Sequence, residues 1–492
     1  MIKPNLFLIF SYIFLFFPLP IIAQQSVNVE DKKICVNNLS QEIELLINEP
    51  SRQKETWGIV IENLKDNQVL YQLNSDKFLI PASNIKLLTT ASVLKKLGSD
   101  FTIDTPISIE RKSTDNQLLS TTINSLIIEG KGDPTFSQKQ LDMIAKKLAE
   151  EGIKKVNNLI LIDGYLSEPS TNYTWEFEDI YFYFAVPVNS LILDQNTVNF
   201  TLVHGDINKP PILQWSNELA GKQWLIENRV YTRDENSQFN ISVLPLFARS
   251  SLVMTGDFPI NKETNTWRLS IPNPTLYFQE SLVKTLNNYA IEVENKEIIE
   301  QKQKLDIPQQ FLLEISSPTL AELITITNQD SNNLYAEVLL KYLGDESQNE
   351  WESLEKIAQE LGISKDDYRI RDGSGLSRHN LITPSALVTL LKAMNNSQYK
   401  EIFYNSLSVA GKNGTLKNRF QNTNIADNLY GKTGTLTGVA SLSGYLKTAH
   451  YDDIVFSIIV NHSIANSPTL RNSIDQIVLL LGKLERCSFS EM

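Results

Sequence analysis

The most reactive pairing in this chain is a serine and a lysine three residues apart. The stretch PASNIKLLTT contains Ser83 and Lys86, and residues three apart on a helix share one face. A serine hydroxyl becomes a nucleophile when a neighbouring base takes its proton. A lysine amine can be that base if burial or a second cation keeps it neutral. The pair could therefore perform acyl transfer, although an ordinary helix start with a solvated lysine has the same spacing.

Spacing alone does not select this pair. A second pair, Ser92 and Lys95, lies nine residues further along the same expected helix, which places it on the opposite face. Pro81 suits a helix start, where unpaired N–H groups and the helix dipole favour a developing oxyanion. The helix start therefore favours Ser83. The serines followed by a lysine three residues later are Ser51, Ser83, Ser92, Ser281, Ser353 and Ser397.

Two further motifs could complete a site for acyl transfer. The stretch GKTGTLTG holds the only Lys-Thr-Gly of the chain, at residues 432–434. A strand rich in threonine and glycine beside a cation can bind a carboxylate, although a glycine-rich hairpin explains the same residues equally well. Ser331 to Asn333 offers a hydroxyl and an amide. Ser-x-Asn carries little weight alone, because it recurs at Ser26, Ser170 and Ser347.

The elements that must position these motifs lie toward the two ends of the chain. Apolar periodicity predicts helices there, and alternating apolar stretches predict strands at 57–74, 440–448 and 453–463. Residues 100–310 are rich in short strands and turns. We therefore expect an α+β fold in which residues 24–99 and 311–492 form a catalytic domain interrupted by a mostly β insert, 100–310. The predicted helices cover 38–50, 82–97, 317–329, 332–344, 351–362, 383–397 and 467–485.

Length and charge narrow the class of protein. A chain of 492 residues with 42% hydrophobic and 21% charged residues suits two or three globular domains. The net charge of −12 argues against nucleic acid as a partner. Lys3, an apolar run over 6–22 and Ala23 predict a signal peptide over residues 1–23, with an uncleaved anchor as the alternative. We expect an exported, periplasmic protein with at most peripheral membrane association.

Cysteine and histidine usage gives no sign of a metal or cofactor. Cys35 and Cys487 lie near opposite ends of the mature chain and could form a disulfide, or could remain two free thiols. The four histidines show no metal-ligand spacing. We therefore expect neither a metal nor a cofactor.

In chain order, S-x-x-K, S-x-N and K-T-G resemble the motif set of the penicillin-recognising serine enzymes. The long interval between Ser83 and Ser331 resembles the low-molecular-mass class C penicillin-binding proteins, the D-Ala-D-Ala carboxypeptidases and endopeptidases of peptidase family S13. Asn332 stands where aspartate is frequent, which is a mild departure. Further stretches similar to that family are GKGDPTF, AVPVNSLILDQN, SNNLYAE, RDGSGLSRHNLITP and VAGKNGTLKNRF.

The resemblance implies a penicillin-binding/β-lactamase-like transpeptidase fold with a five-stranded antiparallel sheet. It also implies roles: Ser83 as nucleophile, Lys86 as base, and Ser331 as proton relay. Asn333 would hold Lys86 and the substrate amide, and Lys432 would keep Lys86 neutral. By the same resemblance, the substrate carboxylate would bind at Thr433, Gly434 and Thr435, and the backbone N–H groups of Ser83 and Thr435 would form the oxyanion hole.

Two motifs keep alternative interpretations. Asp179 falls where family members can carry an acid near the diaminopimelate side chain, but it could equally be a solvated acid beside Glu176 and Glu178. RDGSGLS, residues 371–377, is most simply a tight glycine turn between helices.

The resemblance implies a serine-type D-Ala-D-Ala carboxypeptidase or endopeptidase that acts on peptidoglycan stem peptides. β-Lactam antibiotics would be covalent inhibitors. One alternative is a β-lactamase or esterase on the same fold, which would need a deacylation base that no motif supplies. The other is a non-catalytic module that binds cell wall, which would have no need for the complete motif set.

Overall fold

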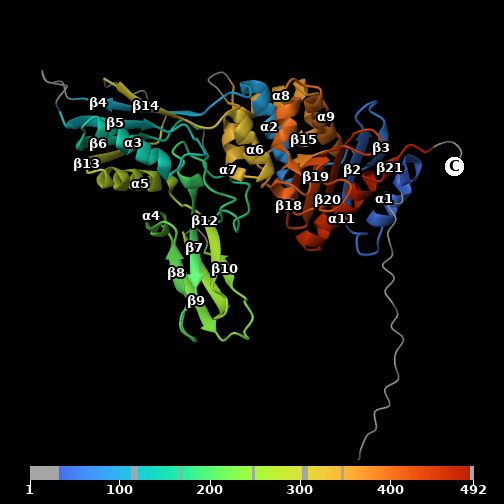
Figure 1. Cartoon of the computed structure of the whole chain (residues 1–492), viewed down its shortest axis with the longest axis horizontal. Coiled ribbons are helices and arrows are strands. Elements are labelled where there is room, and N and C mark those ends of the chain that lie inside the picture. Colours follow the sequence, from blue (N-terminus) through green and yellow to red (C-terminus); the bar gives the residue numbers. More distant parts are fainter. Residues whose placement is uncertain are drawn as a thin grey trace, which may run out of the picture.

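The computed structural model describes residues 33–111, 120–166, 169–246, 250–301, 308–344 and 348–487. The expected signal peptide over residues 1–23 lies outside these ranges. Figure 1 shows a helix-and-sheet body formed by the two ends of the chain, and an insert that extends away from it. No helix in the described ranges is long and apolar enough to span a bilayer.

The catalytic body is built on one antiparallel sheet with the strand order β17-β18-β19-β20-β2-β3. Strand β17 has two residues, so the long strands form the five-stranded sheet that the resemblance implies. Strand β2 comes from the start of the chain and pairs with β20 from its end. The bounds are β2 Thr56–Asn63, β3 Val69–Leu73, β17 Ser408–Val409, β18 Leu429–Leu436, β19 Val439–Leu446 and β20 Ile454–Asn461.

Helices cover both faces of this sheet, and every residue of β19 and β20 is buried as a result. Alternating side chains of one strand enter different cores. Ile59 of β2 belongs to the core that α1 and α11 cover, whereas Val60 belongs to the core that includes α2, α6, α7, α8 and α9. The first helix pair is α1 Leu39–Ile47 and α11 Ser467–Leu481. The other side has α2 Ile85–Leu97, α6 Leu320–Gln329, α7 Asn333–Lys341, α8 Glu350–Glu360, α9 Pro384–Asn395 and α10 Lys400–Ser406.

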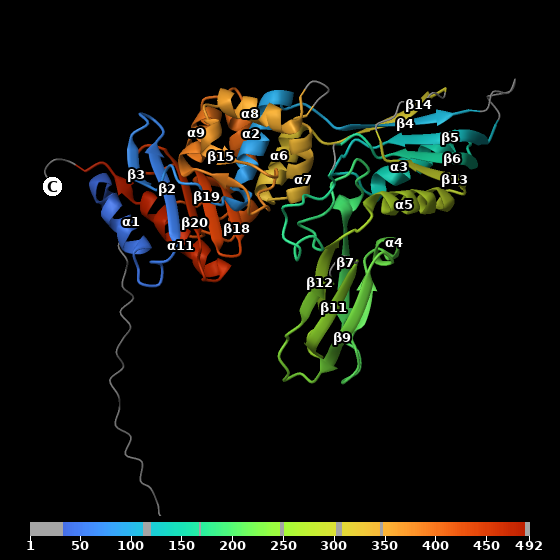
Figure 2. The same ribbon diagram turned by 180° about the vertical axis from the view of Figure 1, so that it is seen from behind.

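The insert contains a mixed sheet with the order β13-β6-β5-β4-β14 and two three-stranded sheets, β12-β7-β8 and β10-β11-β9. Figure 2 shows the two smaller sheets projecting together from the rest of the molecule. The bounds are β4 Asp104–Glu110, β5 Thr122–Glu129, β6 Lys155–Ile162, β7 Thr197–Val203, β8 Ile212–Trp215, β9 Leu225–Arg233, β10 Ser242–Pro245, β11 Ser251–Pro259, β12 Thr264–Ser270, β13 Glu292–Ile299 and β14 Gln310–Ser316.

The insert differs from the sequence expectation in two respects. Helices α3 (Gln138–Glu150) and α5 (Pro274–Asn288) pack together, with α5 against β13, so the insert is less purely β than expected. Strand β14 pairs with β4, which places residues 311–316 in the insert's sheet rather than in the catalytic part. The sequence of β14 has the pattern of an ordinary strand. Only its pairing with β4 shows that it joins the sheet of the insert. We keep the division into two domains as a proposal with this shifted boundary.

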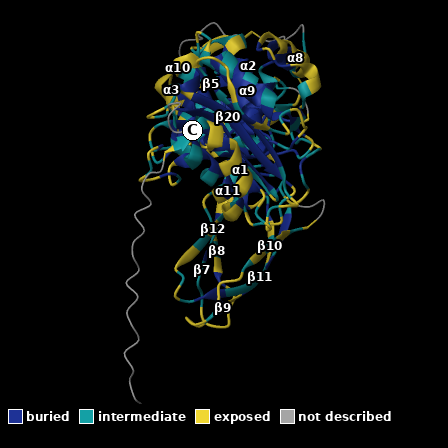
Figure 3. Ribbon diagram, turned by 90° about the vertical axis from the view of Figure 1, so that its right-hand side faces the viewer, coloured by how far each residue is buried: buried dark blue, intermediate teal, exposed yellow. Residues whose placement is uncertain are grey.

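The two ends of the described chain meet at the side of the catalytic body away from the insert (Figure 1). Strand β1 (Ile34–Cys35) pairs in parallel with β21 (Leu484–Glu485), and a disulfide joins Cys35 to Cys487. Figure 3 looks onto this side and shows the buried catalytic sheet behind exposed helix surfaces. The short elements α4 (Glu218–Gly221), β15 (Tyr368–Arg369) and β16 (Leu381–Ile382) complete the fold.

Candidate functional site

The structure brings Ser83 and Lys86 together at the start of α2. Ser83 lies in a 3-10 turn, Ala82–Asn84, and the α-helix follows directly at Ile85. The distance between Lys86 Nζ and Ser83 Oγ is 3.0 Å. Ala82 has a φ of +48°, a left-handed conformation that costs energy for a residue with a side chain. Strain of this kind concentrates at functional sites, which agrees with a serine presented by this turn.

The second serine–lysine pair of this helix is separated. Ser92 is buried, and its hydroxyl has no hydrogen-bond partner within the described part of the chain. Lys95 points elsewhere and forms a surface ion pair with Glu360 at 3.3 Å. The expectation that only one pair can face the site agrees with this arrangement.

Lys86 is fully buried and held by acceptors from three different elements. Besides contacting Ser83, Nζ donates to Asn333 Oδ1 at 2.7 Å and to the carbonyl of Ser374 at 2.6 Å. Burial lowers the pKa of this amine to about 7, against the opposing charges of Asp372 and Glu337. A substantial fraction of Lys86 is therefore neutral near pH 7, as a proton acceptor must be.

Ser331, Asn333 and Lys432 complete the cluster. Lys432 Nζ donates to Ser331 Oγ at 2.9 Å and to the carbonyl of Thr433 at 2.9 Å. Asn333 is the first residue of α7, and its Nδ2 donates to the carbonyl of Phe184 at 2.7 Å. Ser331 has a φ of +56°, so it too occupies a strained conformation beside the site.

Repulsion between the two buried lysines lowers the pKa of Lys432, but it is not among the main causes of the lowered pKa of Lys86. Lys432 was expected to keep Lys86 neutral through its charge. Burial is instead the main cause of the lowered pKa of Lys86. Burial, followed by repulsion from Lys86, holds the pKa of Lys432 well below its ordinary value.

Strand β18 carries the Lys-Thr-Gly motif and passes against the turn that holds Ser83. A Cβ at Gly434 would collide with the Ser441 hydroxyl and the carbonyl of Pro81, so only glycine allows this approach. Thr435 lines the cleft beside Ser83. Thr433 is buried, and its hydroxyl donates to Thr415 Oγ1 at 2.7 Å. Of the two threonines expected to bind a carboxylate, only Thr435 therefore faces the cleft.

A cavity of about 670 Å³ opens over Ser83 between the catalytic body and the insert. Asp179 lies in its wall, partly buried. Burial, followed by repulsion from Glu176 and Glu178, raises the pKa of Asp179 to about 6, whereas Arg378 acts in the opposite direction. The remaining wall is mixed, with Tyr183, Phe184 and Leu376 beside Gln195, Arg268 and Arg378. No cluster of three or more metal-ligating side chains occurs within the described ranges.

Comparison with known proteins identifies the family. The D-Ala-D-Ala carboxypeptidase 3 (S13) family profile matches residues 39–483. The chain belongs to peptidase family S13. The penicillin-sensitive carboxypeptidase A of Dictyostelium discoideum is 30% identical, over 94% of this chain and 96% of the relative. The D-alanyl-D-alanine carboxypeptidase of Actinomadura sp. (strain R39) is 25% identical, over 87% of this chain and 81% of the relative.

The fold of this S13 peptidase is also that of a solved structure. Penicillin binding protein 4 from Haemophilus influenzae superimposes with a TM-score of 0.77 and 21% identity, covering 91% of this chain and 98% of that one. The α+β penicillin-binding fold and the family expected from the motifs are therefore confirmed. The chain is a serine-type D-Ala-D-Ala carboxypeptidase.

A buried acidic support behind Lys86 was not expected from the sequence. Glu337 accepts the backbone N–H groups of Gly373 at 3.2 Å and Ser374 at 2.8 Å. Asp372 accepts from the N–H groups of Gly375 and Ser377. Burial, followed by the charge of Asp372, raises the pKa of Glu337 to about 7. The RDGSGLS segment is thus a glycine turn, as expected, and it also supplies the carbonyl that contacts Lys86.

We expect Glu337→Gln to slow acylation by this S13 peptidase and to lower its stability. Glutamine places an NH2 against one of the two backbone N–H groups, so one hydrogen bond is lost and the Ser374 carbonyl shifts. The free energy of unfolding should fall by about 1–3 kcal/mol. Acylation should slow by roughly 10- to 100-fold. Urea unfolding and the rate of benzylpenicillin acylation measure the two effects.

The control is Glu360→Gln, which removes only a surface ion pair with Lys95. It should leave both quantities nearly unchanged. A Glu337→Gln enzyme that is less stable but acylates at the parent rate would contradict a link between Glu337 and Lys86.

Four groups around the site were absent from the sequence prediction, although three of them lie in stretches that resemble the family. Glu337 ends SNNLYAE, Thr415 lies in VAGKNGTLKNRF, and Gln195 lies in AVPVNSLILDQN. Arg268 lies outside all these stretches, and only the fold brings it to the cleft.

Proposed function

We propose that this S13 peptidase cleaves the D-Ala-D-Ala bond of peptidoglycan stem peptides through an acyl-enzyme on Ser83. The observation that carries the proposal is the 3.0 Å contact between Ser83 Oγ and a fully buried Lys86 with a pKa of about 7. A neutral amine at that distance can accept the hydroxyl proton as the oxygen attacks. The same chemistry would cut D-alanyl cross-links if the leaving amine belongs to a second peptide.

The reaction follows from the neighbours of this pair. Ser83 Oγ bonds to the carbonyl carbon while its proton passes to Lys86, and the N–H groups of Ser83 and Thr435 stabilise the oxyanion. The C–N bond then breaks, and Ser331 delivers a proton to the departing amine. Lys432 donates to Ser331 at 2.9 Å and can replenish that proton. Water then attacks the ester, and its proton passes through Ser331 back to Lys432. Lys86 returns its proton to Ser83 Oγ as the ester C–O bond breaks, which releases the shortened peptide and restores the free enzyme.

Substrate binding uses the cleft-facing side of the same residues. We assign the terminal carboxylate to the Thr435 hydroxyl, because the Thr433 hydroxyl already donates to Thr415. Thr433 then contributes to carboxylate binding only indirectly, through its hydrogen bond to Thr415. Gly434 allows β18 to approach the turn that holds Ser83. One N–H of Asn333 Nδ2 donates to Phe184, which leaves the other for the substrate amide carbonyl.

β-Lactam antibiotics should form the same ester and hydrolyse slowly. The test is intact-protein mass spectrometry after exposure to benzylpenicillin, with peptide mapping of the adduct and a time course of its loss. A stable adduct on Ser83 is the expected result. Rapid loss with turnover would indicate a β-lactamase, and no adduct on folded protein would reject the acyl-enzyme.

We place the enzyme outside the cytoplasm, in the periplasm, because residues 1–23 have the pattern of a signal peptide. Peptidoglycan is found there. The acidic net charge of −12 gives no reason to expect a nucleic-acid partner.

We further propose that Asp179 binds the ammonium of a diaminopimelate-type side chain. Asp179→Asn should lower kcat/KM about 10-fold for a peptide with a free side-chain ammonium before D-Ala-D-Ala, because a charge-assisted contact is lost. The N-acetylated peptide should be unaffected. With a pKa of about 6, the carboxylate becomes protonated as the pH falls through 6, so the selectivity should fade in acid.

The matched control for Asp179 is Glu178→Gln, an exposed neighbour that does not line the cleft. It should preserve the preference for the ammonium peptide. Equal losses in the Asp179 variant for the free and the acetylated peptide would contradict the assignment.

A further inference from the structure

A second hollow continues from the acylation cleft. Its volume is about 680 Å³, similar to the 670 Å³ of the cleft over Ser83. Gln195, Arg268 and Ile326 line both, so the two hollows are adjacent, and we refer to them together as the groove. Either hollow alone is large enough for a small peptide end. The two volumes together exceed what a single departing D-alanine requires.

A strained turn of the insert borders both hollows through Gln195. Asp194, Gln195 and Asn196 have φ values of +50°, +57° and +54°, a left-handed run that residues with side chains rarely adopt. The fully buried side chain of Asn196 fixes the turn by donating to the carbonyl of Pro187 and to Asn189 Oδ1, both at 2.9 Å. Strain held this firmly indicates that the turn serves a function.

Gln195 connects this turn to the S-x-N segment of the catalytic body. Its Oε1 accepts from Asn332 Nδ2 at 3.0 Å and from Arg268 Nη2 at 3.4 Å. Asn332 also accepts the N–H of Tyr335 through Oδ1. An aspartate at position 332 could accept but could not donate to Gln195, so asparagine suits this contact. The groove therefore leaves the acylation site beside Ser331 and Asn332.

Arg268 on β12 offers a positive charge to the groove. Its Nε donates to Thr197 Oγ1 at 2.9 Å, and its guanidinium lies over the Tyr183 ring, 5.6 Å from the centroid. Within the described part of the chain, Arg268 forms no ion pair. Asp194 lines the same hollow, but its Oδ2 accepts from the Tyr277 hydroxyl. Burial lowers the pKa of Arg268, a penalty that an anion in the groove would offset.

We propose that the second hollow binds the departing arm of a cross-linked peptide, and that Arg268 pairs with a carboxylate on that arm. The inference rests on the proposed function and deepens it. In the proposed function, Ser331 delivers the proton to the leaving amine. Ser331 also lines the cleft to which the second hollow is adjacent. When the amide bond of a cross-link breaks, the acyl group stays on Ser83 and the amine leaves with a whole peptide attached. A planar guanidinium held in place suits a carboxylate on that peptide.

Binding can be measured without turnover in full-length enzyme carrying Ser83→Ala. The probe is a synthetic pair of stem peptides joined by one D-alanyl cross-link, with free carboxylates on the arm that would depart. Adding Arg268→Gln should weaken binding of this probe about 10-fold. The same probe with those carboxylates amidated should bind both proteins equally, and so should an uncrosslinked pentapeptide. Isothermal titration calorimetry gives the dissociation constants.

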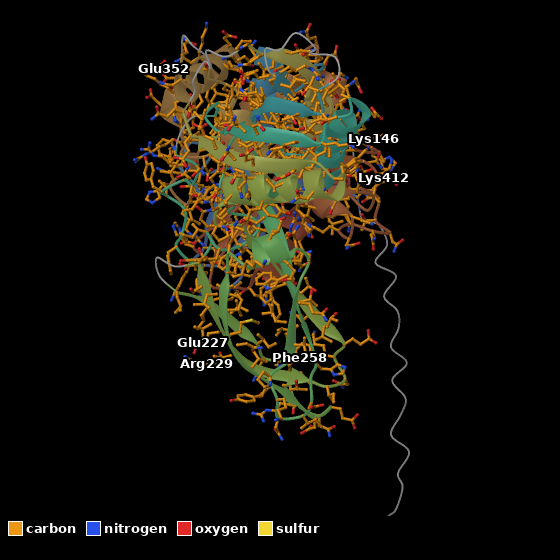
Figure 4. The ribbon with its side chains drawn as sticks, turned by 90° about the vertical axis from the view of Figure 1, so that its left-hand side faces the viewer. Lys146, Glu227, Arg229, Phe258, Glu352 and Lys412 are labelled. Atoms are coloured by element: carbon orange, nitrogen blue, oxygen red, sulfur yellow. A yellow bond between two sulfur atoms is a disulfide. The ribbon has the colours of Figure 1, made fainter. Side chains whose placement is uncertain are left out.

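The matched control is Arg229→Gln on β9. Arg229 is exposed, pairs with Glu227 and lines neither hollow, and Figure 4 shows both residues on the projecting sheets. This variant should bind all three peptides as the parent does. Unchanged binding of the carboxylate probe to the Arg268 variant would overturn the proposal. Equal weakening for all three peptides would also overturn it, because Arg268 would then only support the Asn332 segment.

The test separates this proposal from the proposed function. Benzylpenicillin labelling of Ser83 is measured in the Arg268→Gln single variant and in the parent. If the parent is not labelled, the acyl-enzyme assignment fails, while the binding constants still decide whether the second hollow takes an anionic arm. Loss of labelling in Arg268→Gln alone would contradict a role confined to the departing arm.

Discussion

Ser83→Ala should abolish both penicillin labelling and D-alanine release while leaving the protein folded. The hydroxyl contributes one contact to the cluster, with Lys86 Nζ, so its removal should change the fold little. The acylation rate should fall by at least about 10⁴-fold, since removal of a nucleophile eliminates the covalent route. Mass spectrometry of the adduct and a D-alanine release assay measure the effect, with circular dichroism as the check on folding.

Ser92→Ala is the matched control for this substitution. Ser92 has the same lysine spacing on the same helix, but its buried hydroxyl has no hydrogen-bond partner in the described ranges. Its removal should leave labelling unchanged. D-alanine release by the Ser83→Ala protein at an appreciable fraction of the parent rate would contradict the acyl-enzyme.

The acylation rate should rise with pH through a midpoint of about 7, the pKa of Lys86. Below that pH the amine is protonated and cannot accept the serine proton, whereas above it the neutral form predominates. The second-order rate constant for benzylpenicillin should thus fall about tenfold per pH unit well below 7. Lys86→Ala should reduce acylation nearly as strongly as loss of Ser83, and should leave Asn333 Oδ1 and the Ser374 carbonyl without this donor.

Glu337 complicates this profile, because its pKa also lies at about 7. The Glu337→Gln enzyme separates the two groups. A midpoint that remains in that variant, moved to lower pH because the charge of Glu337 no longer raises the pKa of Lys86, belongs to Lys86. A profile that becomes flat there would assign the titration to Glu337 and would contradict Lys86 as the base.

Local sequence was sufficient for most elements of the catalytic body, although the short helix α10 (Lys400–Ser406) was not predicted. The predicted helix that ends at Gly98 is α2, which ends at Leu97 with Gly98 at a φ of +81°. Strand β20 lies within the predicted range 453–463, and β19 begins one residue before the predicted range 440–448. The signals were strong because glycine at a left-handed position and unbroken apolar runs depend little on distant contacts.

Long-range placement could not be predicted in the same way. Helix α3 has a capping box at Ser137 and Gln140, which is a local helix signal. The prediction of a mostly β insert did not include this helix, because short strands surround it in the sequence. Strand β14 has no local feature that selects β4 as its partner. Gln195, Glu337 and Arg268 act at the site only because the chain folds back on itself, so their positions follow from tertiary packing rather than from spacing.

The pairing of β2 with β20 also has a temporal consequence. A chain emerging from the ribosome presents Ser83 long before residues 454–461, which complete the sheet beside β2. Contacts of such long sequence separation form slowly, and the link between Cys35 and Cys487 cannot close before Cys487 has been made. A nascent or truncated chain therefore carries the nucleophile without its catalytic surroundings. We therefore expect hydrolytic activity only after β20 has joined the sheet beside β2.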